Sequence, residues 1–482
     1  MVEIVIDPVT RIEGHLSVRV EVEGGVVKDS WVHGTMFRGF ENILVNRDPR
    51  DAIFITPRIC GVCYIDHGMA SALCLESAFN VRPPPLATVM RNIIHLSNWM
   101  YDHVLHFWIL AGPDYGPPYG SFREMEAFKG EGYVKALEIA RICREASSVF
   151  AGKTPHQSTL VPGGVAETPE PKRITEFTYR VLRAKEWIES YMIPFVERFY
   201  GEYGGASDAG ERPANLMAYG AFDDPSLDPT KRAHKPGVII DGSLVATDLY
   251  GAIEPNIWEE VTHSWYSEDS AGKPDEAEPP TPRYTGLDKD GKYSWAKSPR
   301  WGEKVVEVGP LARMWSTALQ SGGRVETDAG TWKPPKKPNA IERIYARAYE
   351  AAFCATLVIK ELYSLLTLIE EGEDKVWEPY RMPKAAGGKG LTEAARGALG
   401  HWMRVEGGRI RRYQVITPTA WNASPRDGKG MKGPLEEALE GSRIRSEDPS
   451  LEVVRIVRSF DPCLACTVHV YDPRGTRCRK IP

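Results

Sequence analysis

The chain has 482 residues, of which 42% are hydrophobic and 26% charged, as in ordinary globular proteins. Its formal net charge is −5, so we expect no nucleic-acid partner and no general attraction to an anionic membrane surface. The N-terminus lacks the basic and then apolar segments of a secretion signal, and the most apolar stretch, 351–369, is interrupted by Lys360 and Glu361. We therefore expect no direct membrane span, and either a cytoplasmic protein or one that is membrane-associated or exported through a partner subunit.

The hydrophobic pattern predicts an α+β, predominantly helical fold. Apolar residues alternate over 15–33 on both sides of Gly24 and Gly25, which predicts a β hairpin near the N-terminus. Apolar residues recur at helical spacing over four long segments, 86–110, 133–150, 174–199 and 344–369. These segments predict a core made of a long-helix bundle.

We predict a single large domain over 1–482, because the helical segments flank an irregular middle part. An N-terminal β region covers 1–60, and the helical core combines 61–205 with 339–469. Between 206 and 338, short strand-like runs alternate with Pro, Gly and charged residues, which predicts a peripheral excursion of loops and strands.

Two Cys-x-x-Cys motifs stand near opposite ends of the chain. Cys60 and Cys63 lie in the segment 58–67, and Cys463 and Cys466 lie in the segment 461–469. Such pairs most often mean a structural zinc site, or a redox disulfide in each pair. However, 400 positions separate Cys63 from Cys463, which is unlike a small zinc module. The spacing favours one metal site that folding brings together.

The neighbours of these cysteines resemble the large subunit of nickel-iron hydrogenases. The family pattern Arg-x-Cys-Gly-x-Cys-x-x-x-His matches at 58–67, and Asp-Pro-Cys-x-x-Cys-x-x-His matches at 461–469. Further family-like blocks occur in the expected order, at Asp7–His15, Gly34–Glu41, Glu393–His401 and Pro418–Asn422. Because the blocks span nearly the whole chain, the resemblance covers the protein rather than one module.

The resemblance implies a nickel-iron centre that carries out reversible heterolytic cleavage of dihydrogen. Cys60 and Cys463 would be terminal nickel ligands, and Cys63 and Cys466 would bridge nickel to an iron that carries carbon monoxide and cyanide. Soft thiolates suit both metals. Glu13 matches the proton-relay glutamate of the family, which makes it a catalytic residue.

The resemblance also implies roles for residues around the centre. Arg396 and Thr419 would lie near the cyanides, Asp102 and Asp461 would complete a polar canopy, and His67 would lie just outside the ligands. Glu41, the carbonyl of Val415 and His469 would hold a magnesium ion, or sometimes iron. One departure concerns position 395, where the family commonly has proline and this chain has alanine.

The C-terminal segment and the missing cysteines imply two partners. Residues 470–482 follow His469 as a basic extension, so we expect a maturation protease to cut after His469. The other four cysteines form no iron-sulfur motif, which implies a separate iron-sulfur small subunit for electron transfer. The alternatives are the large subunit of a deazaflavin-reducing hydrogenase and a structural zinc scaffold. A third alternative is a metal-free structural homologue such as the quinone-site subunit of respiratory complex I. That subunit lacks the four cysteines, so their presence here argues against it.

Overall fold

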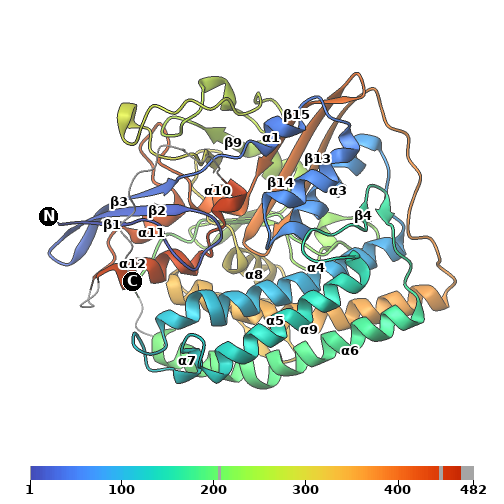
Figure 1. Ribbon diagram of the computed structural model, residues 1–482, viewed down its shortest axis with the longest axis horizontal. Helices are drawn as coiled ribbons and strands as arrows, with labels where there is room; N and C mark the ends of the chain where they lie inside the picture. The colour runs from blue at the N-terminus through green and yellow to red at the C-terminus, as the bar shows by residue number, and fades with distance from the viewer. Residues whose placement is uncertain (1, 205–207, 445–448, 468–482) are drawn as a thin grey trace.

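The computed structural model describes residues 2–204, 208–444 and 449–467. Long helices run side by side along one side of the molecule (Figure 1). Several small antiparallel sheets lie in the rest of the described chain. This arrangement confirms the α+β fold with a long-helix bundle core.

The N-terminal sheet has three antiparallel strands in the order β1-β2-β3. They are β1 (Val2–Ile6), β2 (Leu16–Glu23) and β3 (Val26–Gly34), with Val18 opposite Val32. Gly24 and Gly25 have φ values of 59° and 74°, a region that glycine adopts without strain. The predicted hairpin is therefore confirmed as β2 and β3, and β1 adds an edge strand.

Four long helices form the bundle: α4 (Pro85–Leu105), α5 (Glu131–Ala151), α6 (Pro171–Trp187) and α9 (Ala340–Glu370). The helix predicted over 174–199 is split into α6, a π-helical turn over Ile188–Met192, and α7 (Ile193–Tyr203). Pro194 in the first turn of α7 cannot donate an intrahelical hydrogen bond, which accounts for the widened turn before it.

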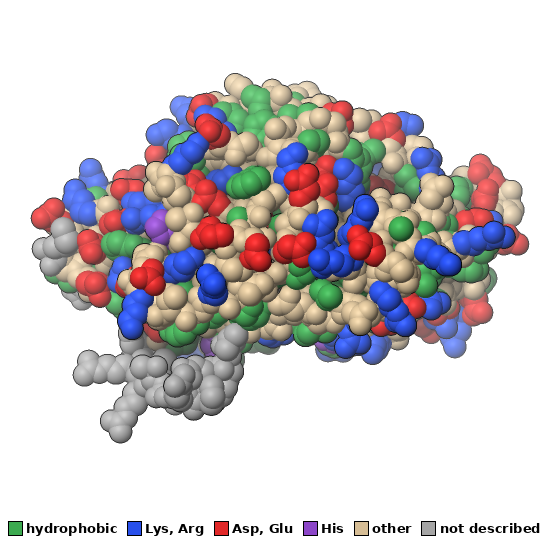
Figure 2. Space-filling model, turned by 90° about the horizontal axis from the view of Figure 1, so that it is seen from above, with side chains coloured by type: hydrophobic (Ala, Val, Ile, Leu, Met, Phe, Trp, Pro, Cys, Tyr) green, Lys and Arg blue, Asp and Glu red, His purple; other side chains and the backbone are tan. Residues whose placement is uncertain are grey.

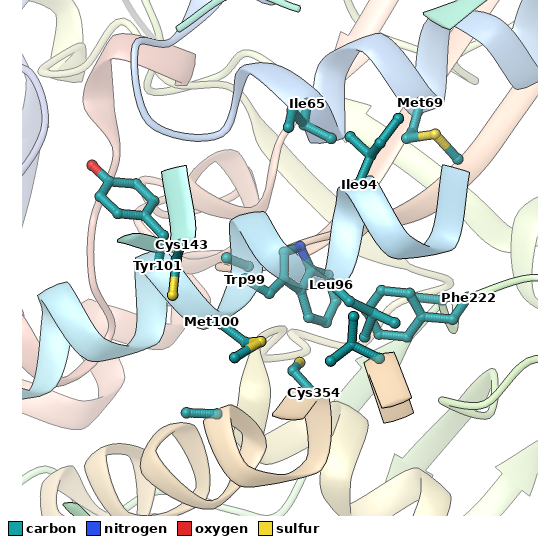
Figure 3. Packing of buried hydrophobic residues seen from close by; sticks show 14 of the residues in the cluster. Ile65, Met69, Ile94, Leu96, Trp99, Met100, Tyr101, Cys143, Phe222 and Cys354 are labelled. Atoms are coloured by element: carbon teal, nitrogen blue, oxygen red, sulfur yellow. The ribbon is translucent and has the colours of Figure 1, made fainter. Parts of the chain in front are cut away.

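The bundle core is made of large side chains from different helices. Trp99 and Met100 on α4 lie near Cys143 on α5, Cys354 on α9 and Phe222 from the middle segment (Figure 3). Trp99 is fully buried, and replacing a buried Trp by Ala costs about 3–5 kcal/mol. The bundle is thus the rigid base on which the rest of the chain is placed.

Among the described residues, α9 is the one helix long and apolar enough to cross a membrane by length and composition. In the structure it packs against α4, α6 and α7. It also carries the buried charged residues Arg347 and Glu350 on the face that meets the rest of the molecule.

A second three-stranded sheet corrects the prediction that 339–469 is helical. Its strands are β13 (Ala385–Ala394), β14 (Gly397–Glu406) and β15 (Arg409–Ile416), in sequence order. Helix α3 (Tyr64–Phe79) packs on β13, because Gly388 and Gly390 leave no side chain between them. A Cβ at Gly390 would lie 2.2 Å from the carbonyl oxygen of Ala70. The sequence did not predict this sheet, because the glycines of β13 reflect close packing against α3 and give no strand pattern.

The segment 206–338 contains short strands, as predicted, and one helix that was not predicted. The strands are β6 (Leu216–Ala218), β7 (Gly237–Ile240), β8 (Ser243–Ala246), β9 (Ile257–Glu260), β10 (Ser298–Trp301), β11 (Val325–Thr327) and β12 (Gly330–Trp332). The helix is α8 (Pro310–Leu319), which begins with proline and packs against α9.

The other elements are short. They are α1 (Phe40–Leu44), α2 (Ala52–Ile55), β4 (Leu160–Val161), β5 (Gly164–Val165), α10 (Pro418–Asn422), α11 (Pro434–Leu439), α12 (Pro449–Ser459) and α13 (Leu464–Thr467). Figure 2 shows Lys and Arg interspersed with Asp and Glu over one face of the molecule. This mixture agrees with the small net charge.

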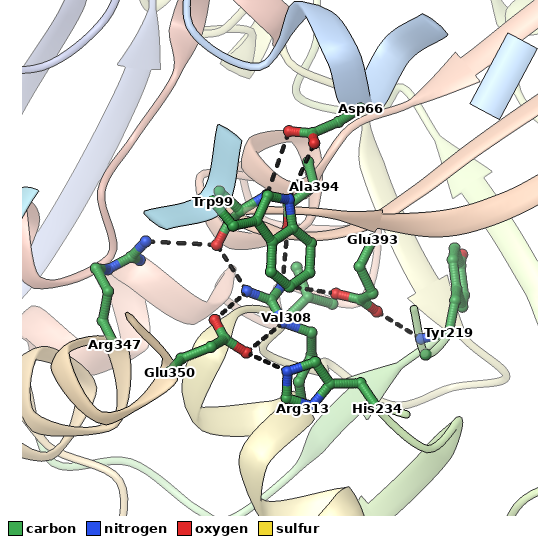
Figure 4. A network of polar contacts seen from close by, with 12 residues as sticks. Asp66, Trp99, Tyr219, His234, Val308, Arg313, Arg347, Glu350, Glu393 and Ala394 are labelled. Atoms are coloured by element: carbon green, nitrogen blue, oxygen red, sulfur yellow. Dashed lines mark hydrogen bonds and ion pairs between the residues drawn. The ribbon is translucent and has the colours of Figure 1, made fainter. Parts of the chain in front are cut away.

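A buried polar network ties the bundle to the second sheet (Figure 4). Arg313 on α8 donates to Glu350 on α9 at 2.5 Å and to Glu393 on β13 at 2.9 Å. His103 and His234 each place a ring nitrogen within 3.0 Å of Glu350. Removing one partner of such a network costs about 3–5 kcal/mol, because a buried charge is left unpaired. The network fixes α8, α9 and β13 relative to one another.

Candidate metal centre

The two cysteine motifs reach the centre on different elements. Cys60 follows a 3-10 turn that ends at Ile59, and Cys63 immediately precedes α3. Cys463 immediately precedes α13, the short helix that contains Cys466. Asp461 adopts a φ of 52° before Pro462, a conformation that turns the chain toward the first motif.

Three of the four predicted thiol ligands converge. The Sγ atoms of Cys60 and Cys463 lie 3.3 Å apart, and the three Sγ atoms of Cys60, Cys63 and Cys463 all lie within 4.8 Å of one another. Each of these three residues is at most 2% exposed. The side chain of Cys466 lies outside the described part of the structure. Three buried thiols at this spacing fit a thiophilic metal such as nickel, iron or zinc.

The surroundings of Cys60 favour its thiolate form. The backbone amides of Val62 and Cys63 donate to its sulfur at 3.2 and 3.3 Å. By contrast, burial alone raises the pKa of the Cys143 thiol in the bundle to about 12. Cys60 therefore lies in a more polar environment than Cys143, whose thiol packs in the bundle core.

The N-terminal block pairs with the second cysteine motif. Glu13 and Cys463 form a parallel bridge, in which the amide of Leu464 donates to the carbonyl of Glu13 at 2.7 Å. Gly14 makes this approach possible, since a Cβ there would lie 2.3 Å from the amide nitrogen of Ala465. The block Asp7–His15 is thus part of the wall of the site.

Glu13 is brought to the site with a carboxyl group that resists ionisation. Burial and the charge of Cys60 raise its pKa, although Arg396 and Arg38 act in the opposite direction. A carboxyl with a raised pKa holds its proton more readily than an ordinary glutamate does, which suits a group that exchanges protons. The structure therefore places Glu13 next to the two cysteine motifs.

Arg396 links the two predicted canopy carboxylates. Its guanidinium donates to Asp102 at 2.8 Å and contacts Asp461 at 3.2 Å. Burial raises the pKa of Asp102 to about 7, although Arg396 opposes the shift. At Asp461, burial is outweighed by Arg396 and Arg347, which lower its pKa. All three predicted residues are therefore brought together beside Cys463.

Thr419 and His67 also lie next to the cysteines. The hydroxyl oxygen of Thr419 accepts a hydrogen bond from the amide of Cys463 at 2.8 Å. His67 Nδ1 lies 3.1 Å from His401 Nε2, and burial lowers the pKa of His67 to about 4. His67 is therefore a neutral ring one helical turn after Cys63.

A second candidate site lies at Glu41. Its carboxylate accepts from the amide of Val415 at 3.1 Å, and both residues line a cavity of about 50 Å³. The cavity is also lined by Glu259, Lys297 and Gln414. Burial raises the pKa of Glu41 to about 7, although the charge of Lys297 acts in the opposite direction. His469, the third predicted ligand, lies outside the described residues.

The residues at this cavity fit a hydrated magnesium ion. The buried carboxylate of Glu259 and the half-buried carboxylate of Glu41 line the cavity, and the amide oxygen of Gln414 has no hydrogen-bond partner among the described residues. Magnesium prefers oxygen ligands and retains water molecules, which such an oxygen could accept from. A cation there would also favour the ionised form of Glu41.

Several site residues were missed from the sequence. Arg347 on α9 contacts Asp461 at 3.1 Å and lies near the carbonyl of Ala395 (Figure 4). Glu259, Lys297 and Gln414 come from segments with no recognisable pattern. Arg38 lies inside the block Gly34–Glu41, and this block was the one signal that pointed to any of the missed residues.

Comparison with known proteins gives a consistent result. The family described as nickel-dependent hydrogenase matches residues 38–119 and 116–469, and a family described as HoxL-like matches residues 3–37. The large subunit of the periplasmic [NiFeSe] hydrogenase from Desulfomicrobium baculatum is 36% identical, over 97% of this chain and 95% of the relative. The hydrogenase-2 large chain of Escherichia coli is 31% identical, over 98% of each chain.

Solved structures agree with the sequence matches. The actinobacterial-type NiFe-hydrogenase from Ralstonia eutropha H16 gives a TM-score of 0.90 at 30% identity, covering 97% of this chain and all of that one. A [NiFeSe]-hydrogenase structure from Dm. baculatum gives a TM-score of 0.85 at 34% identity, with the same coverage. Both similarities extend over nearly the whole chain.

Proposed function

Because the chain belongs to the nickel-dependent hydrogenase family, we propose that it is a hydrogenase large subunit whose own residues carry out reversible heterolytic cleavage of dihydrogen. The observation that carries the proposal is the convergence of the thiols of Cys60, Cys63 and Cys463 in one buried site. In this proposal Cys466 would supply the fourth thiol. When bound, a nickel-iron centre supplies the electron-pair acceptor that makes dihydrogen acidic.

In this proposal the four thiolates have different positions. Cys60 and Cys463 would be terminal ligands of nickel, and Cys63 and Cys466 would be shared with iron. The amide hydrogen bonds to the sulfur of Cys60 keep that thiolate oriented. The contact between Thr419 and the amide of Cys463 does the same for the second motif.

Glu13 takes the proton that leaves dihydrogen. Because its pKa is raised, the Glu13 carboxyl group can accept this proton and later release it. The pairing of its backbone with Cys463 holds Glu13 beside the thiols. A base that is held at a fixed distance from the reacting atoms accepts the proton faster than a base that must diffuse to them.

Arg396 holds the diatomic ligands proposed for iron. Carbon monoxide and cyanide on iron would leave cyanide nitrogens that need donors, and the guanidinium and the hydroxyl of Thr419 would supply them. Asp102 and Asp461 keep the guanidinium in place from two sides. Arg396 therefore contributes a fixed positive charge without taking part in proton transfer.

Magnesium is the ion that we propose for the cavity at Glu41. Glu41, the carbonyl of Val415 and His469 would be its protein ligands, and Glu259 and Gln414 would accept hydrogen bonds from its water molecules. This ion would join the segment after β3 to the end of the second cysteine motif. Such a link would stabilise the placement of that motif.

Maturation and partner binding complete the proposal. The large-subunit relatives imply an iron-sulfur small subunit, and no iron-sulfur motif occurs in the sequence of this chain. A protease would remove 470–482 after His469, and the nickel-dependent hydrogenase family matches only up to residue 469. An intact mass ending at His469 is expected for active enzyme, and active, nickel-loaded protein that retains Pro482 contradicts this step.

The compartment follows from the partner subunit in this proposal. One relative is named periplasmic, and another, from Wolinella succinogenes, is named quinone-reactive. We propose that this chain is exported or membrane-associated through its partner. Fractionation of cells that express both subunits tests this step, and large subunit that stays in the soluble cytoplasmic fraction while bound to its partner contradicts it.

The experiment that tests the function combines metal analysis with infrared spectroscopy of the purified complex. We expect one nickel per chain, hydrogen-dependent reduction of an artificial acceptor dye, and absorption bands of metal-bound carbon monoxide and cyanide. Stoichiometric zinc without nickel would establish the structural zinc scaffold instead. Nickel without the infrared bands would contradict only the carbon monoxide and cyanide ligands proposed for iron.

A further inference from the structure

One arginine contacts the backbone of both cysteine motifs. Arg38 lies between β3 and α1, and the same Nη2 atom donates to the carbonyl oxygen of Ile59 and, at 2.7 Å, to that of Ala465. These carbonyls belong to the peptides that lead directly into Cys60 and Cys466. The two motifs therefore share one hydrogen-bond donor.

The position of this guanidinium is itself fixed. Its plane lies over the ring of Phe40, with 4.7 Å between Cζ and the ring centroid. Gly39 between them adopts a φ of 66°, which lets the chain turn back at this point. A second contact, from Nη1 to the carbonyl of Arg58 at 3.4 Å, extends along the first motif. Arg38 is thus held by its own segment and reaches across to two others.

The charge of Arg38 also acts on the site. Its guanidinium lies against the peptides that lead into Cys60 and Cys466, so a positive charge stands beside both motifs. A site of four thiolates carries excess negative charge, which a nearby permanent cation stabilises. Arginine keeps its charge at every physiological pH.

We propose that Arg38 is a positioning residue that holds the two cysteine motifs at metal-binding distance by donating to the peptides before Cys60 and Cys466. The inference rests on the proposed nickel-iron site and adds to it a residue that is not a ligand. The motifs come from opposite ends of the chain, so their relative placement depends on contacts between them. Arg38 supplies a contact through backbone atoms, so it acts on both motifs at once.

The test measures how fast nickel leaves the purified complex of the large and small subunits. Wild type, Arg38→Met and Arg38→Lys are incubated with excess EDTA, and the nickel that remains bound is measured over time. Met removes the donors and the charge, and Lys keeps the charge on a side chain that is one atom shorter. We expect nickel loss about tenfold faster for Arg38→Met, the effect of losing charge-assisted hydrogen bonds, and an intermediate rate for Arg38→Lys.

Arg47→Met is the matched control, because Arg47 is an exposed arginine that donates to the carbonyl of Ile43 within its own segment. A second control uses alkylation followed by mass spectrometry. In Arg38→Met, we expect Cys60 to be labelled as nickel leaves, while Cys143, buried in the bundle, stays protected. The control variant should match wild type in both measurements.

Two outcomes would overturn the inference. Arg38→Met that loses nickel at the wild-type rate shows that the shared donor is not needed. Labelling of Cys143 in step with Cys60 shows that Arg38 supports the whole fold rather than the site. Wild-type complex that contains no nickel at all would instead contradict the proposed function, so the two failures are distinguishable.

Discussion

The sulfur atoms of Cys60 and Cys463 lie 3.3 Å apart, although 403 positions separate the two residues in the chain. Cys60 is placed by the turn before α3, which packs on the second sheet. Cys463 is placed by the bridge to Glu13. The distance between the sulfurs therefore depends on several independent packing contacts, and loss of the metal is the expected result of disturbing any of them.

Replacement of a motif cysteine should remove the metal. Cys60→Ser offers a hard oxygen in place of a soft thiolate, so we expect less than about 1% of the wild-type nickel and hydrogen oxidation. Cys143→Ala is the control, since this buried cysteine packs in the bundle. It should lower Tm while it leaves nickel per folded chain unchanged. Full nickel occupancy in Cys60→Ser would contradict the ligand assignment.

Glu13→Gln should separate metal binding from proton transfer. The amide keeps the size of the side chain and the backbone bridge to Cys463, but it cannot accept the proton. We expect normal nickel content and a loss of about 10²- to 10⁴-fold in exchange between dihydrogen and deuterated water, the usual contribution of a positioned base. Glu23→Gln, at the exposed end of β2, is the control. Exchange at the wild-type rate in Glu13→Gln would rule out the relay.

Much of the site could be predicted because its residues lie in short contiguous blocks. Glu13, Cys60 and Arg396 each stand inside such a block, and the structure brings all three blocks together. The helices were predicted from apolar spacing, because burial on one face of a helix selects that spacing directly. The hairpin was predictable from local sequence as well, because Gly24 and Gly25 supply the positive φ values of its turn.

The remainder depends on contacts that leave no local pattern. Arg347 reaches Asp461 from the middle of α9, where an arginine looks like any solvated helix residue. Glu259 on β9 meets Lys297, the residue before β10, at the cavity. Gly390 reflects the approach of α3 rather than a turn in its own strand. Such residues are selected by partners that are distant in sequence, so a single sequence does not reveal them.

Arg396→Lys should impair catalysis more than stability. Lysine keeps the positive charge but cannot contact Asp102 and Asp461 together, since it lacks the planar fork of a guanidinium. We expect kcat to fall about 10- to 100-fold, as for other groups that orient a metal site, with nickel retained. Arg404→Lys, an exposed arginine on β14, is the control. Infrared bands and kcat that both match wild type would contradict the placement of Arg396 beside the iron ligands.

Glu41→Gln should remove magnesium without removing nickel. The amide lacks the charge that the ion needs, so we expect magnesium below about 10% of wild type and a lower Tm. Glu276→Gln changes an exposed glutamate and serves as the control. Added magnesium should raise the Tm of wild type and of the control, but not that of Glu41→Gln. Equal magnesium in all three proteins would place the ion elsewhere.

Glu361 on α9 predicts a pH dependence of stability that is independent of the metal site. Burial raises its pKa to about 7, with a hydrogen bond from Asn92 acting in the opposite direction. An unfolded glutamate ionises near pH 4.5, so between pH 4.5 and 7 the unfolded chain loses its proton and the folded protein keeps it. The cost of burying this group is therefore absent below pH 4.5, grows up to pH 7 and is then constant.

Removing that carboxyl should make the difference visible. Relative to Glu361→Gln, wild type should lose stability as pH rises from 4.5 to 7, by at most about 3 kcal/mol and by less where solvent reaches the carboxyl. Chemical unfolding of both proteins, in the complex and across this pH range, measures the difference. Glu371→Gln, at the exposed end of α9, should follow wild type. A difference between wild type and Glu361→Gln that does not change with pH would show that Glu361 ionises normally in the folded protein.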